Sequence, residues 1–374
     1  MRLNHGWVDG LMEGLIEGVI EGWIEGWIDG LIDVECCFAL RCAAMAATHI
    51  IPSHTIPYVT ADQVRAALPY PTLMDALRIA FAEADQVQVP RRHAHTLPDD
   101  ATLLLMPAWR AQRQLGIKLV TVTPGNRERD LPTVHALYVL SDTDSGVPLA
   151  IIDGEVLTLR RTAAVSAMAS GFLSRADSRS LLMVGTGRLA PEMVVAHCVA
   201  RDIQRVMVWG RDERKTQESI GRIRQAGLSN QVSIESVAGL SGACAEADII
   251  CCATTSTEPL LHAEWIKPGT HIDLVGGFRP NMREADDALM STAALFVDTL
   301  EGALAEAGDL VQPMQAGLLR AADIVSDLGA LARATHPGRR SADQITLFKS
   351  VGSALADLSA AGLVHQQSGP MNAV

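Results

Sequence analysis

Apolar and polar positions divide the first half of the chain into helices and strands. Between residues 58 and 85, apolar side chains recur at helical spacing, which predicts a helix broken at Pro69 and Pro71. Thr60, with Gln63 three residues later, is typical of a helix start. A helix is also predicted at 157–174, and strands at 101–109, 115–125, 131–142 and the end of 141–153. This half is therefore expected to be α+β.

From residue 180 onward, short apolar runs alternate with amphipathic segments. The predicted strands are 180–185, 205–210, 232–236, 247–254 and 270–277, with helices at 189–200 and 213–227. Such alternation is typical of a doubly wound parallel sheet. Residues 345–364 predict a helix that packs back onto the first half. We expect an α/β protein whose first domain, 45–174 plus 331–374, is discontinuous around a second domain at 175–330.

Residues 1–44 have a pattern of their own. Residues 7–34 repeat a unit of two apolar residues, an acid and usually Gly. This period drifts by only about 40° per repeat on a helix, so an interfacial or partner-binding helix is one interpretation. The repeated Gly opposes it, at about 1 kcal/mol each relative to Ala. We expect an extension outside the fold, since an ordinary sequence begins at Met45.

Composition narrows the class of partner. The chain of 374 residues has a net charge of −12 and no block of Lys and Arg, which argues against nucleic-acid binding. No run of 18 apolar residues is present, so no membrane partner is expected. Its seven cysteines lack the spacing of metal ligands. We predict reduced thiols, a cytoplasmic protein and no metal site.

A glycine loop follows the strand at 180–185. Gly185, Gly187 and Ala190 have the GxGxxA spacing that lets a backbone approach a pyrophosphate at the start of a helix. A purely structural turn is the alternative. At the tip of the next strand, Arg211 suits the 2′-phosphate of NADPH, because a guanidinium pairs with phosphate as a fork. Asp212 would instead serve NADH.

Five stretches in this order resemble the ornithine cyclodeaminase/mu-crystallin family. They are TLLLMPAW with IKLVTVTPGN, IIDGEVLTLRRTAAVSAMAS, GTGRLAP with VWGR, HIDLVGGFRPNMREADDALM, and LFKSVGSALADL. The resemblance covers roughly Thr60 to Leu363. It implies a Rossmann domain inserted into an α+β domain that binds substrate and dimerises, and the use of NAD(H) or NADP(H) on amino acids or their imines.

The resemblance also assigns cofactor contacts. Thr133 matches a family position near the nicotinamide ribose, and Thr254 lies at the C-terminal end of a strand, where α/β sheets bind ligands. The predicted cofactor-binding residues are Thr133, Gly185, Thr186, Gly187, Arg188, Leu189, Arg211, Thr254 and Val275.

Members of the family hold the substrate carboxylate with basic residues, which match Arg92, Lys118 and Arg161 here. A guanidinium can clamp a carboxylate bidentately. Lys118 lies in an apolar strand pattern, where burial without a partner is costly, so we predict a catalytic role. It would bind the carboxylate or assist protonation of the imine nitrogen. The alternative proton donors are His93, His95 and His135.

One position departs from the cyclodeaminases. They carry an Asp directly after the glycine pair that matches Gly276 and Gly277, and here Phe278 takes its place. Phenylalanine cannot accept a proton or hold an ammonium group, which argues against cyclodeamination. An aromatic wall suits a flat cyclic imine, so Phe278 is predicted to bind substrate. The alternative is that Phe278 packs in the core and another acid serves.

The sequence therefore predicts reduction of a small cyclic imino acid by NADPH, with NADH as the alternative donor, in a homodimer. The reaction would convert 1-pyrroline-2-carboxylate to L-proline, or 1-piperideine-2-carboxylate to L-pipecolate. The GTGRLAP loop also resembles that of bacterial pyrroline-2-carboxylate reductases. The open alternatives are a cyclodeaminase or L-alanine dehydrogenase-like enzyme of the same family, and a mu-crystallin-like ligand-binding protein.

Overall fold

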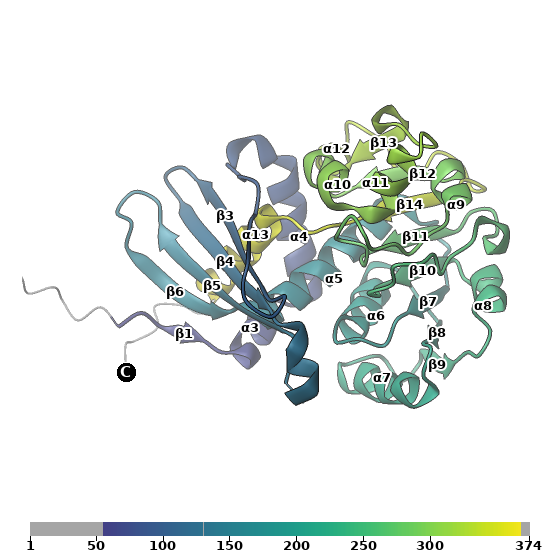
Figure 1. Ribbon diagram of the computed structural model, residues 1–374, viewed down its shortest axis with the longest axis horizontal. Helices are drawn as coiled ribbons and strands as arrows, with labels where there is room; N and C mark the ends of the chain where they lie inside the picture. Colours follow the sequence, from purple (N-terminus) through teal and green to yellow (C-terminus); the bar gives the residue numbers. More distant parts are fainter. Residues whose placement is uncertain (1–54, 130, 368–374) are drawn as a thin grey trace, which may run out of the picture. The chain divides into compact units, whose positions relative to one another are not determined.

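The computed structural model describes residues 55–129 and 131–367 (Figure 1), so the repeat at 7–34 lies outside the described residues. The first part is a six-stranded sheet of order β1-β6-β5-β4-β3-β2, antiparallel except for the pair β1 and β6. Its strands are β1 (Tyr58–Val59), β2 (His93–Thr96), β3 (Thr102–Arg110), β4 (Gln114–Val122), β5 (Val134–Asp142) and β6 (Pro148–Asp153).

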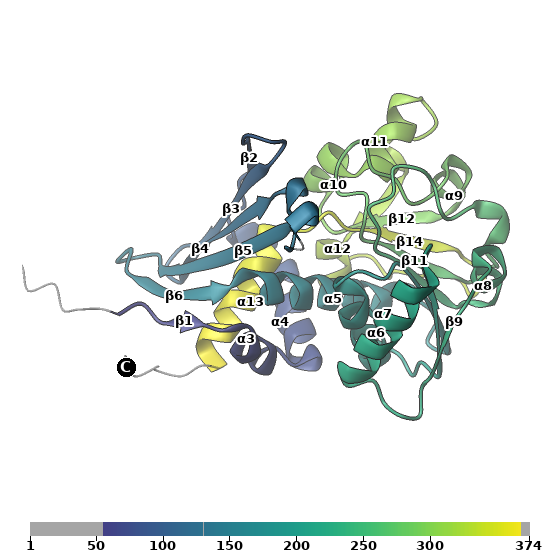
Figure 2. The same cartoon turned by 60° about the horizontal axis from the view of Figure 1, so that its bottom comes forward.

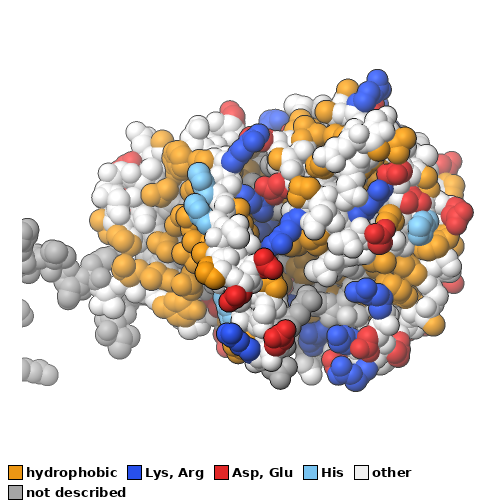
Figure 3. Space-filling model, viewed as in Figure 1, with side chains coloured by type: hydrophobic (Ala, Val, Ile, Leu, Met, Phe, Trp, Pro, Cys, Tyr) orange, Lys and Arg blue, Asp and Glu red, His pale blue; other side chains and the backbone are white. Residues whose placement is uncertain are grey.

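One face of this sheet is covered by helices and the other is open. Helix α13 (Ala354–Gln367) packs on β3, β4, β5 and β6, beside α4 (Tyr70–Ala82) (Figure 2). On β4, Lys118 points into the covered face, whereas its neighbours Ile117 and Leu119 point to the open face. Hydrophobic side chains gather over the open face (Figure 3). The sheet therefore carries the buried Lys118 on its covered face and an apolar surface on its open face.

Two helices confirm the break predicted at the prolines. Helix α3 (Ala61–Ala67) ends before Pro69, and α4 begins with a proline in its first turn. The backbone N–H of Thr60 donates to Gln63 Oε1 at 2.8 Å, as the predicted helix start requires. The longer α5 (Gly154–Leu173) begins at Asp153, which caps it, and is buried on most sides because it packs against both sheets.

The second part is a parallel sheet of eight strands, in the order β13-β12-β14-β11-β10-β7-β8-β9. Its strands are β7 (Ser180–Val184), β8 (Arg205–Trp209), β9 (Ser233–Ser236), β10 (Ile249–Cys252), β11 (His271–Leu274), β12 (Ala294–Val297), β13 (Ile324–Asp327) and β14 (Thr346–Lys349). Its helices are α6 (Leu189–Ala200), α7 (Glu213–Gln225), α8 (Leu240–Glu246), α9 (Asp287–Thr292), α10 (Leu300–Glu306), α11 (Gly308–Gln315) and α12 (Leu328–Ala332). The predicted α/β class and doubly wound sheet are confirmed.

Both faces of the parallel sheet are buried. Successive residues of β7 alternate between two hydrophobic cores: Leu181 and Met183 belong to the core shared with α5 and α6, and Leu182 and Val184 to the core on the other side. Strand order reverses between β7 and β10, which is where ligands bind in open α/β sheets. Among the described residues, no helix combines the length and apolar character needed to cross a membrane.

The C-terminal segment corrects one prediction. Residues 345–364 were expected to form one helix, but the first part is β14, which pairs with β11 and β12 inside the parallel sheet. A short, fully buried strand has no alternation that separates it from a buried helix. The predicted first domain included 331–374 and therefore β14, but β14 lies in the parallel sheet that was assigned to the second domain. Packing joins residues from Ile56 onward into one compact unit.

Candidate active site

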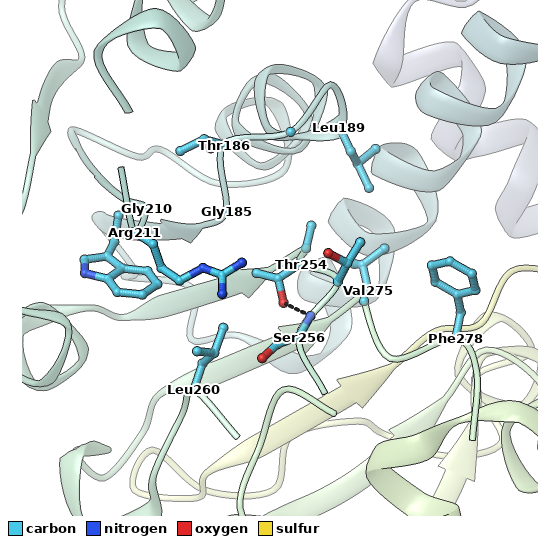
Figure 4. Close-up of a pocket in the computed structure, with 15 residues that line it drawn as sticks. Gly185, Thr186, Leu189, Gly210, Arg211, Thr254, Ser256, Leu260, Val275 and Phe278 are labelled. Carbon is cyan, nitrogen blue, oxygen red and sulfur yellow. Dashed lines mark hydrogen bonds between the residues drawn. The ribbon is translucent and has the colours of Figure 1, made fainter. Parts of the chain in front are cut away.

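A cavity of about 350 Å³ opens where strand order reverses, between the loops that follow β7, β8, β10 and β11 (Figure 4). The predicted residues that line it are Gly185, Thr186, Gly187, Leu189, Arg211, Thr254, Val275 and Phe278. Trp209, Ser256 and Leu260 also line it and were not predicted. Most of the predicted cofactor residues therefore meet around one hollow.

Gly185 and Gly187 of the loop are favoured for different structural reasons. Gly185 has a φ of +119°, and a Cβ there would lie 2.6 Å from the carbonyl oxygen of Ala253. Gly187 would place a Cβ in open space, with no atom within 4 Å. Protein packing thus explains Gly185, whereas Gly187 leaves room for a ligand before the start of α6. The loop fits a dinucleotide pyrophosphate, which needs close backbone approach at a helix N-terminus.

Arg211 and Asp212, the two residues that could recognise the adenosine ribose, make different contacts. Arg211 lines the cavity, and its guanidinium points into it (Figure 4). Asp212 precedes α7, and its carboxylate accepts a hydrogen bond from the backbone N–H of Lys215 at 3.3 Å. The acid is therefore engaged as a helix cap, and the arginine faces the ligand space.

Two predicted cofactor residues lie outside the lining of the cavity. Arg188 precedes α6, and its guanidinium forms an ion pair with Glu155 of α5. Thr133 precedes β5, and its carbonyl accepts a hydrogen bond from the backbone N–H of Thr123 at 2.8 Å. Their contacts with a cofactor stay a prediction.

The structure brings Lys118 and Arg161 together around a carboxylate that was not predicted from the sequence. Asp357 of α13 is fully buried. Its Oδ2 lies 2.8 Å from Lys118 Nζ, and its Oδ1 lies 2.7 Å from Arg161 Nε. Burial would raise the pKa of Asp357, but the charges of Arg161 and Lys118 outweigh burial and lower it. Asp357 is therefore ionised and shared by two cations.

Lys118 has an unusual environment for a lysine. It is almost fully buried, and burial, followed by the charge of Arg161, lowers its pKa to about 8 despite the nearby Asp357. Such an ammonium group holds its proton at neutral pH but gives it up more readily than an exposed lysine. The position is suited to proton transfer.

Arg92 joins this cluster through the loop after β14. Its Nη2 donates to the carbonyl oxygens of Val351 and Gly352 at 3.1 and 3.0 Å. Gly352 has a φ of +83°, and a Cβ there would lie 3.0 Å from Arg161 Nη1. The loop thus passes between Arg92 and Arg161, and its positive φ at Gly352 favours glycine.

The neighbouring arginines face elsewhere. Arg91 is exposed and pairs with Glu301, whereas Arg160 is buried against Glu192 and lies over the ring of Tyr70. The structure therefore groups Arg92, Lys118 and Arg161, but not Arg91 or Arg160. The predicted alternative proton donors lie on the sheet as exposed residues: His93, His95 and His135.

Phe278 is 39% exposed and lines the cofactor cavity, so it does not pack in the core. Two acids lie against Gly276 and Gly277, the glycines before Phe278, and both are engaged. Glu284 Oε1 accepts from the backbone N–H and hydroxyl of Thr254 at 2.7 and 2.8 Å, and Asp309 pairs with Lys349 at 3.1 Å. These three charged side chains are fully buried and support the loops that form the wall of the cavity.

A separate buried cluster lies between β10, β11 and α6. His197 Nε2 lies 3.4 Å from Cys251 Sγ and 3.8 Å from Asp273 Oδ2, and the hydroxyl of Ser166 donates to Asp273 Oδ1 at 3.2 Å. Burial raises the pKa of Asp273 to about 7 and lowers that of His197 to about 4. None of these side chains lines the cavity, so the cluster lies apart from the candidate active site.

Known proteins share this fold and sequence pattern. The model of the ornithine cyclodeaminase/mu-crystallin family matches residues 58–369. A Delta(1)-pyrroline-2-carboxylate reductase of Colwellia psychrerythraea is 36% identical over 315 residues, which cover 83% of this chain and 98% of the relative.

Two solved structures are similar as well. The Delta(1)-pyrroline-2-carboxylate reductase of Thermococcus litoralis, in complex with NADH and L-proline, has a TM-score of 0.79 at 29% identity, with 84% of this chain and 97% of that chain covered. The iminosuccinate reductase of Paracoccus denitrificans, in complex with NAD⁺, has a TM-score of 0.76 at 26% identity, with 84% and 96% covered.

Proposed function

The chain belongs to the ornithine cyclodeaminase/mu-crystallin family, and we propose that it is an NAD(P)H-dependent oxidoreductase that reduces cyclic 2-imino acids. The substrates we propose are 1-pyrroline-2-carboxylate, giving L-proline, and 1-piperideine-2-carboxylate, giving L-pipecolate. Reductases of the first imine among its relatives support this choice.

One observation carries the proposal. Phe278, where cyclodeaminases have their Asp, lines the dinucleotide cavity instead of packing in the core. The ring can form an apolar wall beside the nicotinamide and offers no group to hold a leaving ammonium. A ring-shaped imine that is already formed needs no such group.

The chain's own residues would position and protonate the substrate. Arg92 and Arg161 would hold its carboxylate, since Arg92 Nε and Nη1 have no hydrogen-bond partner among the described residues. Lys118 would share the carboxylate or keep a proton at the imine nitrogen, which makes the imine carbon electrophilic. The bound dinucleotide supplies the hydride. Holding the imine close to it would account for much of the rate.

We propose NADPH as the preferred donor. The position of Arg211 at the cavity and the use of Asp212 as a helix cap support this preference, because a guanidinium can pair with a 2′-phosphate. The two solved structures reported above contain NADH or NAD⁺, so NADH stays the alternative. Measurement of kcat/KM with each donor decides between them.

We also propose that the protein is a cytoplasmic homodimer joined through the open face of the first sheet. Leu119 of β4 lies directly opposite Leu137 of β5, and both are exposed on that face. A contiguous exposed apolar surface of this kind marks an interaction site. The four cysteines of the described part are free thiols, in keeping with a reducing compartment.

The test pairs two reactions. Purified protein is given 1-pyrroline-2-carboxylate with NADPH or NADH, and separately L-ornithine with NAD⁺ or NADP⁺ and an assay for ammonia. We expect oxidation of the reduced dinucleotide with the imine and no ammonia from ornithine. Ammonia release without imine reduction would refute the proposal, and inactivity in both assays would favour a ligand-binding protein.

A further inference from the structure

A second cavity, of about 450 Å³, lies next to Arg92. It is bounded by the segment before β2, by α10 and by the loop after β14. Arg92 therefore faces the cluster with Lys118 and Arg161 on one side, and this cavity on the other. A substrate whose carboxylate is held by Arg92 would have this space available for a side chain.

Each of the two arginines that line the cavity forms an ion pair with a different glutamate of α10. Arg92 Nη2 lies 2.9 Å from Glu306 Oε2, and their side chains are only 19% and 26% exposed. Arg91 Nε lies 2.8 Å from Glu301 Oε1, with 77% and 66% of the side chains exposed. The inner pair is shielded from solvent and the outer pair is not. The cavity offers no unmatched positive charge to a second anionic group.

On this geometry, and building on the proposed function, we propose that Glu306 selects substrates with a single carboxylate. A side-chain carboxylate in the cavity would lie near the carboxylate of Glu306, and two like charges in a shielded site repel strongly. Specificity of this kind comes from a repulsive element against the wrong substrate. Uncharged rings such as those of cyclic imino acids meet no such repulsion.

The iminosuccinate reductase described above acts, by its name, on an imine with two carboxylates. Iminosuccinate is therefore the natural probe. Its reduction transfers a hydride to the imine carbon and a proton to the nitrogen, giving aspartate and the oxidised dinucleotide. It can be formed in the assay from oxaloacetate and ammonium, with oxaloacetate alone as the blank.

The experiment compares wild-type protein with Glu306→Gln and Glu301→Gln. The measured quantity is the ratio of kcat/KM for iminosuccinate to kcat/KM for 1-pyrroline-2-carboxylate. Both substrates have the carboxylate next to the imine, so a substitution that changes the binding of this group affects both values equally and leaves the ratio unchanged. We expect Glu306→Gln to raise this ratio at least about tenfold, because it removes the negative charge that repels the second carboxylate of iminosuccinate. Glu301→Gln, on the same helix, should change it less than about twofold, because the exposed outer pair is screened.

An unchanged ratio in Glu306→Gln, or an equal rise in Glu301→Gln, would overturn the inference. If Glu306→Gln does not fold, Glu306→Ala gives the same comparison, and the wild type alone should be inhibited more weakly by succinate than by pyrrole-2-carboxylate. Stronger inhibition by succinate would also overturn it. A wild type that reduces iminosuccinate but not the cyclic imine refutes the inference and the proposed function together. A wild type that reduces both equally well refutes the inference alone.

Discussion

Asp357→Asn removes the negative charge between Lys118 and Arg161 with almost no change in shape. In the native protein one carboxylate contacts both cations, at 2.8 Å and 2.7 Å, and all three side chains are buried. The variant keeps an amide oxygen as hydrogen-bond acceptor but leaves two buried positive charges without a counter-charge. We therefore expect a large loss of stability.

The size of the loss follows from the burial. Removing one partner of a buried ion pair leaves an uncompensated charge and typically costs about 3–5 kcal/mol. The amide should keep the loss near about 3 kcal/mol, because it still accepts a hydrogen bond. Lys118 can also relieve the strain by losing its proton, since burial and Arg161 already lower its pKa to about 8. The pKa of Lys118 should therefore fall further in the variant.

The assay is urea unfolding at neutral pH, with the double variant Asp357→Asn/Lys118→Met beside the single one. Methionine fills a similar volume without charge, so the double variant should be more stable than Asp357→Asn alone. If the double variant loses as much as the two single variants added together, the cost does not arise from unpaired charge. That result would refute the electrostatic account of the cluster.

Three further predictions concern activity and assembly. Because Lys118 is protonated only below its pKa of about 8, kcat/KM for the imine should fall as pH rises through that value, and Lys118→Arg should abolish this inflection. Arg211→Ser should lower the ratio of kcat/KM for NADPH to that for NADH at least about tenfold, whereas Arg214→Ser, in an exposed ion pair on the nearby α7, should leave it unchanged. Leu119→Lys should convert a dimer to a monomer by light scattering, and Leu318→Lys, an exposed apolar position outside that sheet, should not.

Helices and strands in which apolar residues recur at regular spacing could be predicted from the sequence. The antiparallel strands β3, β4 and β5, the helix α5 and the strand–loop–helix at Gly185 lie close to their predicted ranges. The glycine loop was identifiable because its spacing follows from what a backbone needs near a phosphate. β12 and β13 were missed and β14 was predicted as helix, although β9, β10 and β11 are equally short and were predicted. In a buried run of four residues, the pattern alone does not distinguish a strand from a helix segment.

The family resemblance supplied Arg92 and Arg161, whereas a buried charged residue can be identified because it contradicts its apolar surroundings. Lys118 was identified as a charge in an apolar strand. The same argument applies to Asp357 in the apolar stretch SALADLSAAGLV, and it could have identified the counter-ion. Glu306 carries no such signal, because a glutamate near the end of a short helix is ordinary. Its pairing with Arg92 depends on tertiary contact between segments 214 residues apart, which a single sequence does not contain.

If Arg92, Lys118 and Arg161 hold the substrate carboxylate as proposed, Asp357 and Glu306 would keep these cations in place before the anion arrives. Three buried or half-buried cations close together would repel one another and lower the pKa of Lys118 further. Asp357 balances two of them from the side of α13, and Glu306 holds the third from α10. Each acid contacts its cation from one direction and leaves other donors of the arginines directed elsewhere. The fold thus fixes the cations in place, so for the proposed site the cost of bringing them together would be met during folding and not at substrate binding.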